Sequence, residues 1–435
     1  MWGREMATLQ GQRVRICNPG RHNKDAGPDF ANARLVIDGR EWVGDVEIHV
    51  KASDWYRHGH DKDPAYNSVI LHIVVVDDRR ICRASGEEIP QVTVLMPEKF
   101  YVTYAELTKD LKSIRCGYLL GTLPSLIRED WLESLGVERV QMKAQRLLDY
   151  NARLNGDWEQ AVFVMMARGL GFGLNGLPFE MLAMNLPLKY VYHHAQDLMQ
   201  VEALLFGQAG MLNACDHLFD DYYQRLCVEY GFLARKYGLR PMNPSVWKYA
   251  RTRPQNFPHR RIAMLARALH EGVRFSSSLK EAKGDFDKLM EFFSIKIDGY
   301  WGSHFAFGSD AGESLPRSLS YASRILLLIN VASPFYTAYA SLDGDYVSAE
   351  ASARLLAGLP AEKNSKLKVW EELGFKADDA LRSQSLLHLR DEYCDKGRCL
   401  ECRFGHFFLR RESKPQLCER TAENINSMRL CMEPV

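Results

Sequence analysis

The sequence predicts an α+β protein in three parts: a small mixed sheet over residues 1–105, a large all-α region over 106–389 and a short cysteine-rich segment over 390–435. The first part carries short apolar and β-branched runs separated by turn signals, a pattern typical of strands. In the second, apolar residues recur at helical spacing. Closely spaced cysteines set the third part apart and favour a bound metal.

Composition narrows the class of protein. With 435 residues, 46% of them hydrophobic, the chain is long enough for two or three domains. The longest apolar run, Val69–Val76, is far shorter than the roughly 20 residues of a spanning helix, so no membrane partner is expected. Residues 1–5 lack the pattern of a secretory signal, and ten cysteines without a disulfide framework fit a reducing compartment. We therefore expect a cytoplasmic protein; no pattern predicts its oligomeric state.

Strands account for most of the first part. They are expected at 13–17, 33–37, 45–51, 68–76 and 91–95. Asp38-Gly39 is a hairpin turn between two of them, and Ser53 is an N-cap signal for a short helix that carries His58. The run from Val69 is almost continuously apolar, as in a strand that is buried on both faces.

The second part should contain about ten helices, because glycines and prolines interrupt its helical pattern. The glycines between Gly169 and Gly176 lack the lysine of a phosphate-binding P-loop and follow a helical segment. A helix C-cap and turn is the better interpretation of that stretch.

The strand at 45–51 has one ionisable face and one apolar face, because successive side chains alternate. The ionisable face carries Asp45, Glu47, His49 and Lys51. The apolar face, which we expect to be packed, carries Val46, Ile48 and Val50.

A carboxylate from a neighbouring strand, Asp29, would meet Glu47 across the ladder. Two such carboxylates form a hard-oxygen pocket suited to Mg²⁺ or Mn²⁺. His49 or Lys51 would then orient the bound water or offset charge on a phosphate. The alternative is a charged, solvated strand face with no metal.

This arrangement resembles the core of the PD-(D/E)XK nucleases, in which an aspartate and a (D/E)-x-K strand hold the metal that hydrolyses DNA. Pro28-Asp29 and Glu47-x-His49 are the matching positions. The family's lysine is replaced by His49, and Lys51 is the nearest lysine on the same face. The resemblance implies a restriction-endonuclease-like fold for the first part, and the expected order of strand, strand, helix and strand agrees with it.

Four histidines offer a second type of site. His49, His58, His60 and His72 could form a nitrogen-rich transition-metal site in place of a magnesium site. His72 lies inside a buried strand and is more typical of a satisfied core histidine. His58 and His60 are candidate substrate contacts, although solvent exposure near a helix end would explain them equally well.

Basic residues cluster in the helical part. No acidic residue lies between Glu229 and Glu271, a stretch with nine lysines and arginines and several aromatic residues, although the whole chain nets only +1. Guanidinium groups bind phosphates and aromatic rings stack on bases, so this stretch is a candidate nucleic-acid track. The candidate phosphate-binding residues are Arg251, Arg253, Arg260 and Arg261. Alternatively, these arginines hydrogen-bond helix C-termini or pair with acids elsewhere.

The third part has metal-ligand spacing. Cys394 and Cys399 are separated by four residues, Cys399 and Cys402 by two, and Cys402 and Cys418 by fifteen. Four thiolates at this spacing predict a structural Zn²⁺ site, with a [4Fe-4S] cluster as the alternative. His388 or His406 could replace Cys418, and buried thiols without a metal are the remaining interpretation.

The chain as a whole resembles a family of bacterial proteins catalogued as domain of unknown function 2851. The resemblance is carried by Asn18-Pro19-Gly20, Gly27-Pro28-Asp29-Phe30, Gly44 to His49, Ser53-Asp54-Trp55, His58-Gly59-His60, Tyr66 to His72, Gly207 to Gly210, Arg253 to Pro258, Glu362-Lys363-Asn364 and Cys394 to Cys402. It implies no particular activity.

Together these features predict a metal-dependent nuclease that acts on DNA or RNA. Asp29 and Glu47 would hold the metal, and the arginine track would bind the nucleic acid. One alternative is a non-catalytic nucleic-acid-binding or assembly protein on a degenerated nuclease fold. A third is a hydrolase of small phosphorylated substrates.

Overall fold

The computed structural model describes residues 5–23, 26–94, 98–109, 114–212, 220–250, 252–311, 315–343 and 346–410. The chain divides into two compact units. The first comprises the residues before Leu111 and those from Leu409 onwards, and the second runs from Leu111 to Phe408. We expected boundaries after residues 105 and 389. The second boundary differs from this division, because residues 390–408 belong to the helical unit.

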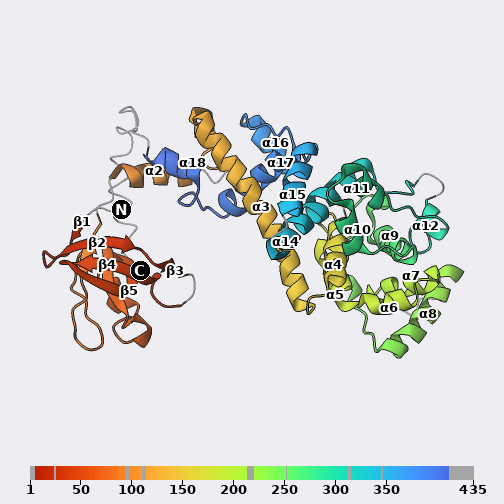
Figure 1. Ribbon diagram of the computed structural model, residues 1–435, viewed down its shortest axis with the longest axis horizontal. Coiled ribbons are helices and arrows are strands. Elements are labelled where there is room, and N and C mark those ends of the chain that lie inside the picture. The colour runs from red at the N-terminus through yellow and green to blue at the C-terminus, as the bar shows by residue number, and fades with distance from the viewer. Residues whose placement is uncertain are drawn as a thin grey trace. The chain divides into compact units, whose positions relative to one another are not determined.

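The first unit is built on a mixed sheet, as predicted (Figure 1). Its strands are β1 (Glu5–Ala7), β2 (Arg13–Asn18), β3 (Arg21–His22), β4 (Phe30–Ile37), β5 (Arg40–Lys51), β6 (Val69–Val76) and β7 (Gln91–Thr93). The order is β1-β2-β4-β5-β6-β7, and β3 pairs with β4. The pairings β1–β2, β2–β4 and β4–β5 are antiparallel, whereas the pairings β5–β6 and β6–β7 are parallel. The predicted hairpin at Asp38-Gly39 is present, with φ values of 47° and 80° that suit a type I′ turn.

The covered face of β5 is the opposite of the one expected. Glu47 and His49 are buried, at 5% and 9% exposure, whereas Ile48 and Val50 are 42% and 56% exposed. Val46 alone of the apolar side is buried. Alternation in a sequence shows that the two faces differ, but it does not say which face another element will cover.

A short helix and a turn cover that ionisable face. Helix α1 (Asp54–Arg57) follows β5, and a 3-10 turn, η1 (Pro64–Tyr66), precedes β6. Ser53 stands at the N-cap of α1 as predicted, but its hydroxyl donates to Asp78 and makes no cap bond. Trp55 of α1 is fully buried and donates its indole N–H to the carbonyl of Cys82. Helix α2 (Glu98–Lys109) is the last helix of the first unit among the described residues before Leu111.

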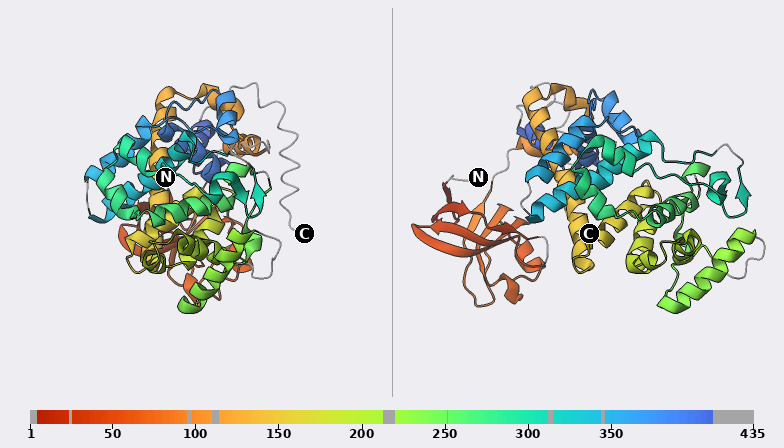
Figure 2. Two further views of the ribbon diagram at one scale, coloured as in Figure 1. Left: turned by 90° about the vertical axis from the view of Figure 1, so that its right-hand side faces the viewer. Right: turned by 45° about the vertical axis from the view of Figure 1, so that its right-hand side comes forward.

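The second unit is almost entirely helical, again as predicted (Figure 1, Figure 2). Its longer helices are α3 (Ser125–Arg153), α4 (Trp158–Leu170), α5 (Gly176–Asn185), α7 (Leu198–Gln208), α8 (Asp221–Tyr237), α9 (Pro258–His270), α10 (Phe275–Ala282), α14 (Ser333–Asp343), α15 (Tyr346–Gly358), α16 (Ser365–Glu372), α17 (Ala380–His388) and α18 (Arg403–Arg410). Its shorter elements are η2 (Gly117–Thr122), α6 (Leu188–His193), η3 (Pro244–Val246), η4 (Pro254–Asn256), α11 (Phe286–Phe292), α12 (Tyr300–Ser303), β8 (His304–Ala306), β9 (Ser309–Asp310), α13 (Tyr321–Leu327) and the π-helical turns η6 (Leu328–Ala332) and η7 (Leu389–Cys394). The described residues therefore hold more helices than the ten expected, because several are very short.

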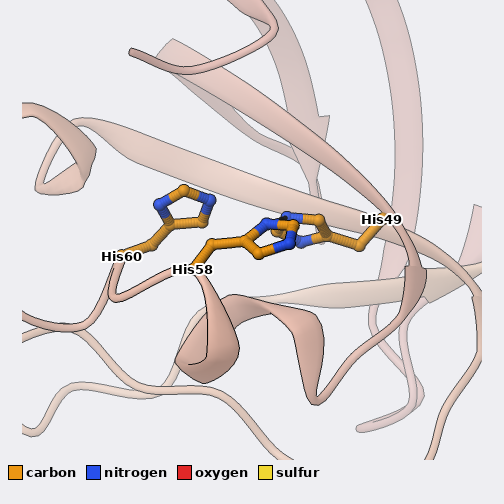
Figure 3. Close-up of side chains that lie close together, drawn as sticks. All are labelled: His49, His58 and His60. Atoms are coloured by element: carbon orange, nitrogen blue, oxygen red, sulfur yellow. Dashed lines mark hydrogen bonds between the residues drawn. The ribbon is translucent and has the colours of Figure 1, made fainter. Parts of the chain in front are cut away.

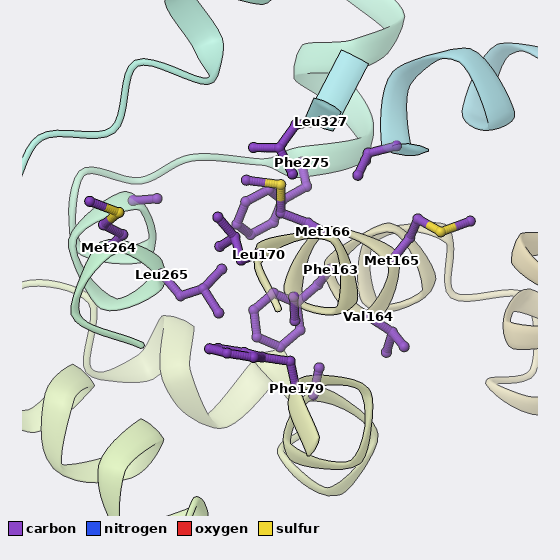
Figure 4. Close-up of a cluster of buried hydrophobic side chains, with 14 of the residues drawn as sticks. Phe163, Val164, Met165, Met166, Leu170, Phe179, Met264, Leu265, Phe275 and Leu327 are labelled. Carbon is purple, nitrogen blue, oxygen red and sulfur yellow. The ribbon is translucent and has the colours of Figure 1, made fainter. Parts of the chain in front are cut away.

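Helix α4 forms the centre of the largest core (Figure 4). Asp157 caps its first turn by accepting from the N–H of Gln160 at 2.9 Å. Phe163, Val164 and Met166 are all buried although they point in different directions from the helix axis. A helix that is apolar on every side must be surrounded, and here α5, α10 and α3 surround it.

The continuous helical segment Tyr321–Leu342 is long and apolar enough to cross a membrane by length and composition. The expectation concerned uninterrupted apolar runs and did not include this helix. Polar residues such as Asn330 interrupt its apolar residues, so no single run in the sequence reveals it. Of its most apolar window, 61% is buried against other parts of the chain.

Candidate metal centre

Asp29 and Glu47 lie side by side because β4 and β5 pair with Phe30 opposite Val46. The backbone N–H of Asp29 donates to Oε2 of Glu47 at 3.0 Å, and the N–H of Ile48 donates to Oδ2 of Asp29 at 2.9 Å. These reciprocal bonds fix both carboxylates at the start of β4. The two acids therefore converge in the structure, as their spacing in the sequence led us to expect.

Three histidines, His49, His58 and His60, lie close together (Figure 3), and two of them lie close to Glu47. Nε2 of His49 and Nε2 of His60 each lie 3.4 Å from Oε1 of Glu47, and Nδ1 of His58 lies 3.2 Å from Nε2 of His49. One nitrogen from each of the three rings lies within 4.8 Å of the other two. Among the described residues, no other set of three histidine, cysteine or acidic side chains is gathered so closely.

Local structure after α1 brings His58 and His60 back towards β5 (Figure 3). His58 is the C-cap of α1, and the N–H of His60 donates to the carbonyl of Trp55 at 3.0 Å. Gly59 between them has a φ of +76°, a left-handed conformation that a residue with a side chain adopts only at a cost. The ring of His60 stacks on Tyr66, with 3.8 Å between centroids.

A hydrogen-bond chain behind the site determines which nitrogen of His49 carries the proton. Gln91 donates from Nε2 to Asp77 at 2.6 Å, so its Oε1 accepts from Nδ1 of His72 at 3.0 Å. In neutral His72, Nε2 must then accept the 2.8 Å bond from Nδ1–H of His49. Nε2 of His49 consequently presents a lone pair to Glu47, His58 and His60.

Burial disfavours the charged forms of Glu47, His49, His60 and His72. It lowers the pKa of His49 to about 4, with neighbouring histidines adding to the effect, and it lowers the pKa of His60 and His72 as well. Burial and then the charge of Asp29 raise the pKa of Glu47 to about 7. Once Glu47 is ionised, its oxygen lies 3.4 Å from Nε2 of His49, whose lone pair accepts a hydrogen bond from Nδ1 of His58 at 3.2 Å. A cation between Glu47 and His49 would use both acceptors.

Two members of the predicted ionisable face lie outside this group. Lys51 is exposed, and its charge acts on Asp78. Asp45 accepts hydrogen bonds from the N–H of Asn32 and the hydroxyl of Ser68, so it has a structural role in pairing β5 with its neighbours. The structure gives no support to Lys51 as a group beside the metal.

The arginine track is only partly available to a ligand. Arg260 is completely buried, and its guanidinium donates to the carbonyls of Trp301, His304 and Pro316. Arg261 is 4% exposed and donates to Asn256. These two arginines are therefore core residues, which corrects their assignment as phosphate contacts.

The alternative interpretation, that arginines bind carbonyls at a helix C-terminus, is right for Arg260, because it binds the end of α12. Arg253 is exposed. Arg251 lies outside the described residues.

The predicted thiol ligands occupy the end of the helical unit. Cys394 ends η7, Cys402 directly precedes α18, and Cys399 lies in the turn between them. None of the three forms a disulfide, and Cys418 lies outside the described residues. The two histidines proposed as substitutes are engaged elsewhere: His388 lies 3.4 Å from Glu138, and His406 binds the carbonyl of Leu400.

Sequence reasoning missed two residues of the sheet site. Gln91 lies opposite His72 in the parallel β6–β7 ladder and orients it, and Tyr66 supports His60. An isolated glutamine at a strand start and a tyrosine in a turn carry no signal of such roles. Only the pairing register could have indicated Gln91.

No curated protein and no solved structure matches the chain. A family model does match, over residues 2–365, which includes the whole sheet site and stops before Cys394. The chain belongs to the family described as "Protein of unknown function (DUF2851)".

Proposed function

We propose that this protein is a metal-dependent hydrolase that cleaves phosphodiester bonds in nucleic acid. The metal would be held by Glu47, His49, His58 and His60, with Asp29 beside them. The observation that carries the proposal is the 3.4 Å approach of Glu47 Oε1 to the lone pair of His49 Nε2 and to Nε2 of His60. A divalent cation between these atoms would be coordinated by all three of them.

The donor set indicates the class of metal. Three imidazoles and one carboxylate suit Mn²⁺, Fe²⁺ or Zn²⁺, whereas Mg²⁺ prefers oxygen ligands throughout. The expectation of Mg²⁺ or Mn²⁺ is therefore narrowed to Mn²⁺ and its neighbours. Nδ1 of His58 can give up its hydrogen bond to His49 when its proton moves to Nε2, because the residue is exposed.

Chemistry at such a centre would be hydrolytic. A bound metal ion lowers the pKa of its water and makes a nucleophile near neutral pH. The charge of Asp29 raises the pKa of Glu47, so the two carboxylates are close together. Asp29 is therefore the candidate to accept a proton from the metal-bound water. The site is open towards His58, the exposed member of the group, which leaves a position for substrate.

Nucleic acid is favoured as substrate by the order β4, β5, α1 and β6. It resembles the PD-(D/E)XK core, with Asp29 before β4 and Glu47 in β5. The burial of Arg260 and Arg261 removes two of the arginines expected to bind nucleic acid in either hypothesis. The non-catalytic alternative depends on His49 in place of the motif lysine, and the experiment below distinguishes it. Hydrolysis of small phosphorylated substrates uses the same metal site and is distinguished by the experiment.

The test compares the full chain with Glu47→Gln and with Glu41→Gln, a control on the same strand whose side chain is exposed and pairs with Arg34. Each protein is loaded with Mn²⁺, Zn²⁺ or Mg²⁺ and given labelled single- and double-stranded DNA, RNA, nucleotides and a chromogenic phosphodiester. We expect cleavage of polynucleotides with Mn²⁺. Glu47→Gln should lose more than the roughly 100-fold that an outer partner of a metal site costs, while Glu41→Gln keeps full activity.

Equal cleavage by Glu47→Gln and the unaltered chain would exclude the proposed centre. Turnover of nucleotides alone would identify a small-molecule hydrolase. Salt-dependent binding of nucleic acid without cleavage, with every metal, would favour the binding protein.

A further inference from the structure

A fourth cysteine lies beside the three predicted thiol ligands. Cys116 stands at the N-cap of η2, near the start of the helical unit, whereas Cys394, Cys399 and Cys402 lie near its end. Cys402 is buried in the core formed by residues such as Trp131 and Tyr393, and Cys116 and Cys394 pack against that same core. The fold therefore gathers thiols from opposite ends of this unit.

Two close contacts bring together the chain segments that carry these cysteines. Gly397, in the turn between Cys394 and Cys399, has a φ of +66°, and a Cβ there would lie 3.2 Å from the guanidinium of Arg115, the neighbour of Cys116. A Cβ on Gly405 would lie 2.0 Å from the carbonyl oxygen of Cys399. Both glycines allow the backbone to pass closely beside the cysteine turns.

The electrostatic environment agrees with this placement. Burial raises the pKa of Cys116 to about 12, and the charges of Cys402 and Cys399 add to that rise. Burial also raises the pKa of Cys394, and the charges of Cys116, Cys402 and Cys399 add to that rise. The pKa of Cys402 is raised by burial and by the charge of Cys399. Every pair among the four sulfurs is thus close enough to interact. One buried and three half-buried thiols in one place are more typical of a metal centre than of packing.

Donors around Cys402 favour its thiolate. The backbone amides of Phe404 and Gly405, in the first turn of α18, hydrogen-bond to its sulfur and lower its pKa, against the larger effect of burial. The indole N–H of Trp131 is buried without a partner of normal hydrogen-bond geometry among the described residues, and it too acts on this sulfur. A thiolate would satisfy all three donors.

We propose that Cys116, Cys394, Cys399 and Cys402 are the four ligands of a thiolate metal centre, with Cys116 in the position that the sequence pattern assigned to Cys418. The centre would join the first turn of the helical unit to its last. Four protein ligands leave no open position, so its role would be structural.

Sulfur spacing indicates what the centre holds. Four Zn–S bonds of about 2.3 Å in a tetrahedron hold the sulfurs about 3.8 Å apart. No three of these four sulfurs lie within 4.8 Å of one another, whereas the nitrogens of His49, His58 and His60 do. The wider arrangement favours a [4Fe-4S] cluster, which takes each thiolate at a different iron.

The experiment measures iron, acid-labile sulfide and zinc in the full chain prepared without oxygen. We expect iron and sulfide in equal amounts with visible absorption from the cluster, and loss of most of both in Cys116→Ser. Cys418→Ser should keep its metal. One zinc per chain that is lost in Cys116→Ser would support the same four ligands and identify the centre as zinc.

Leu120→Ala controls for a loss of metal through unfolding, because Leu120 is buried in the same core and carries no ligand atom. It should lower the melting temperature and keep the metal. The proposal is overturned if the unaltered chain contains neither metal, if Cys116→Ser keeps its full content, or if Cys418→Ser loses it.

Discussion

The sheet unit and the helical unit both bury ionisable groups, but they treat them in opposite ways. At Glu47 and His49 two acceptors face each other at 3.4 Å. At Arg260 a buried cation donates to three backbone carbonyls. The Glu47–His49 pair leaves a gap that a proton or a metal would fill, whereas Arg260 already has acceptors for its terminal guanidinium nitrogens and lacks a partner only at Nε among the described residues.

This difference teaches how to separate functional from structural burial. Charge density in the sequence drew attention to the arginines, yet the fold uses two of them to hold its own loops. The histidine site carries less charge but gathers three ring nitrogens around one point. Donor atoms that converge in this way are a better indication of a ligand than the number of charges.

The largest effect should come from Arg260. Arg260→Met keeps much of the volume and leaves the carbonyls of Trp301, His304 and Pro316 without their donor. We expect the free energy of unfolding to fall by about 3–5 kcal/mol, since buried polar groups lose their partner. Urea denaturation measures this loss.

Arg253→Met is the matched control, because Arg253 is exposed. It should change the stability by no more than about 0.5 kcal/mol. Similar stability of the two variants would break the comparison, because Arg260 would then not be a structural cation.

The second effect concerns the hydrogen-bond chain behind the metal site. Gln91→Leu removes the acceptor that orients His72, so His49 no longer has to present the lone pair of Nε2. Mn²⁺ affinity, measured by calorimetry, should fall by about 10–100-fold, as is typical for outer partners of metal ligands. Gln10→Ala, on an exposed glutamine that binds Glu88, should leave the affinity unchanged. An unaltered affinity in Gln91→Leu would mean that the chain does not set the tautomer of His49.

The third and smallest effect is the pH dependence of metal binding. Glu47 must lose its proton to bind a cation, and its pKa in the folded protein is about 7. Mn²⁺ affinity should therefore rise by up to about tenfold per pH unit below 7 and level off above it. Asp29→Asn should move this midpoint to lower pH, because the charge of Asp29 contributes to the raised pKa. A flat profile between pH 6 and 8 would contradict the assignment of Glu47.

Unfolding of the metal-free protein should respond less clearly to pH. Folding raises the pKa of Glu47, so its contribution to stability decreases as pH rises from about 4.5 to about 7. Folding lowers the pKa of His49, so its contribution increases as pH rises from about 4 to about 6.5. These opposing contributions overlap, which is why metal affinity is the better measurement.

Much of the fold could be predicted from the sequence. Apolar runs located the strands, the Asp38-Gly39 turn fixed a hairpin, and the acids before β4 and within β5 converge as their spacing suggested. These features depend on local patterns and on pairing between neighbouring strands.

The features that were missed depend on contacts between distant segments. Neither the face of β5 that α1 covers nor the burial of Arg260 against α12 is encoded locally. Cys116 is separated from the other three thiols by almost the whole helical unit, so no spacing rule could include it. Burial of a charged helix face is decided by what packs on it, and single-sequence periodicity does not contain that information.

The meeting of Cys116 with Cys394 and Cys402 brings the entrance and the exit of the helical unit together. The chain leaves the first unit before Leu111 and re-enters it at Leu409. A block whose two ends are neighbours can be gained by a gene in one recombination event, because the host chain needs only a small opening to receive it.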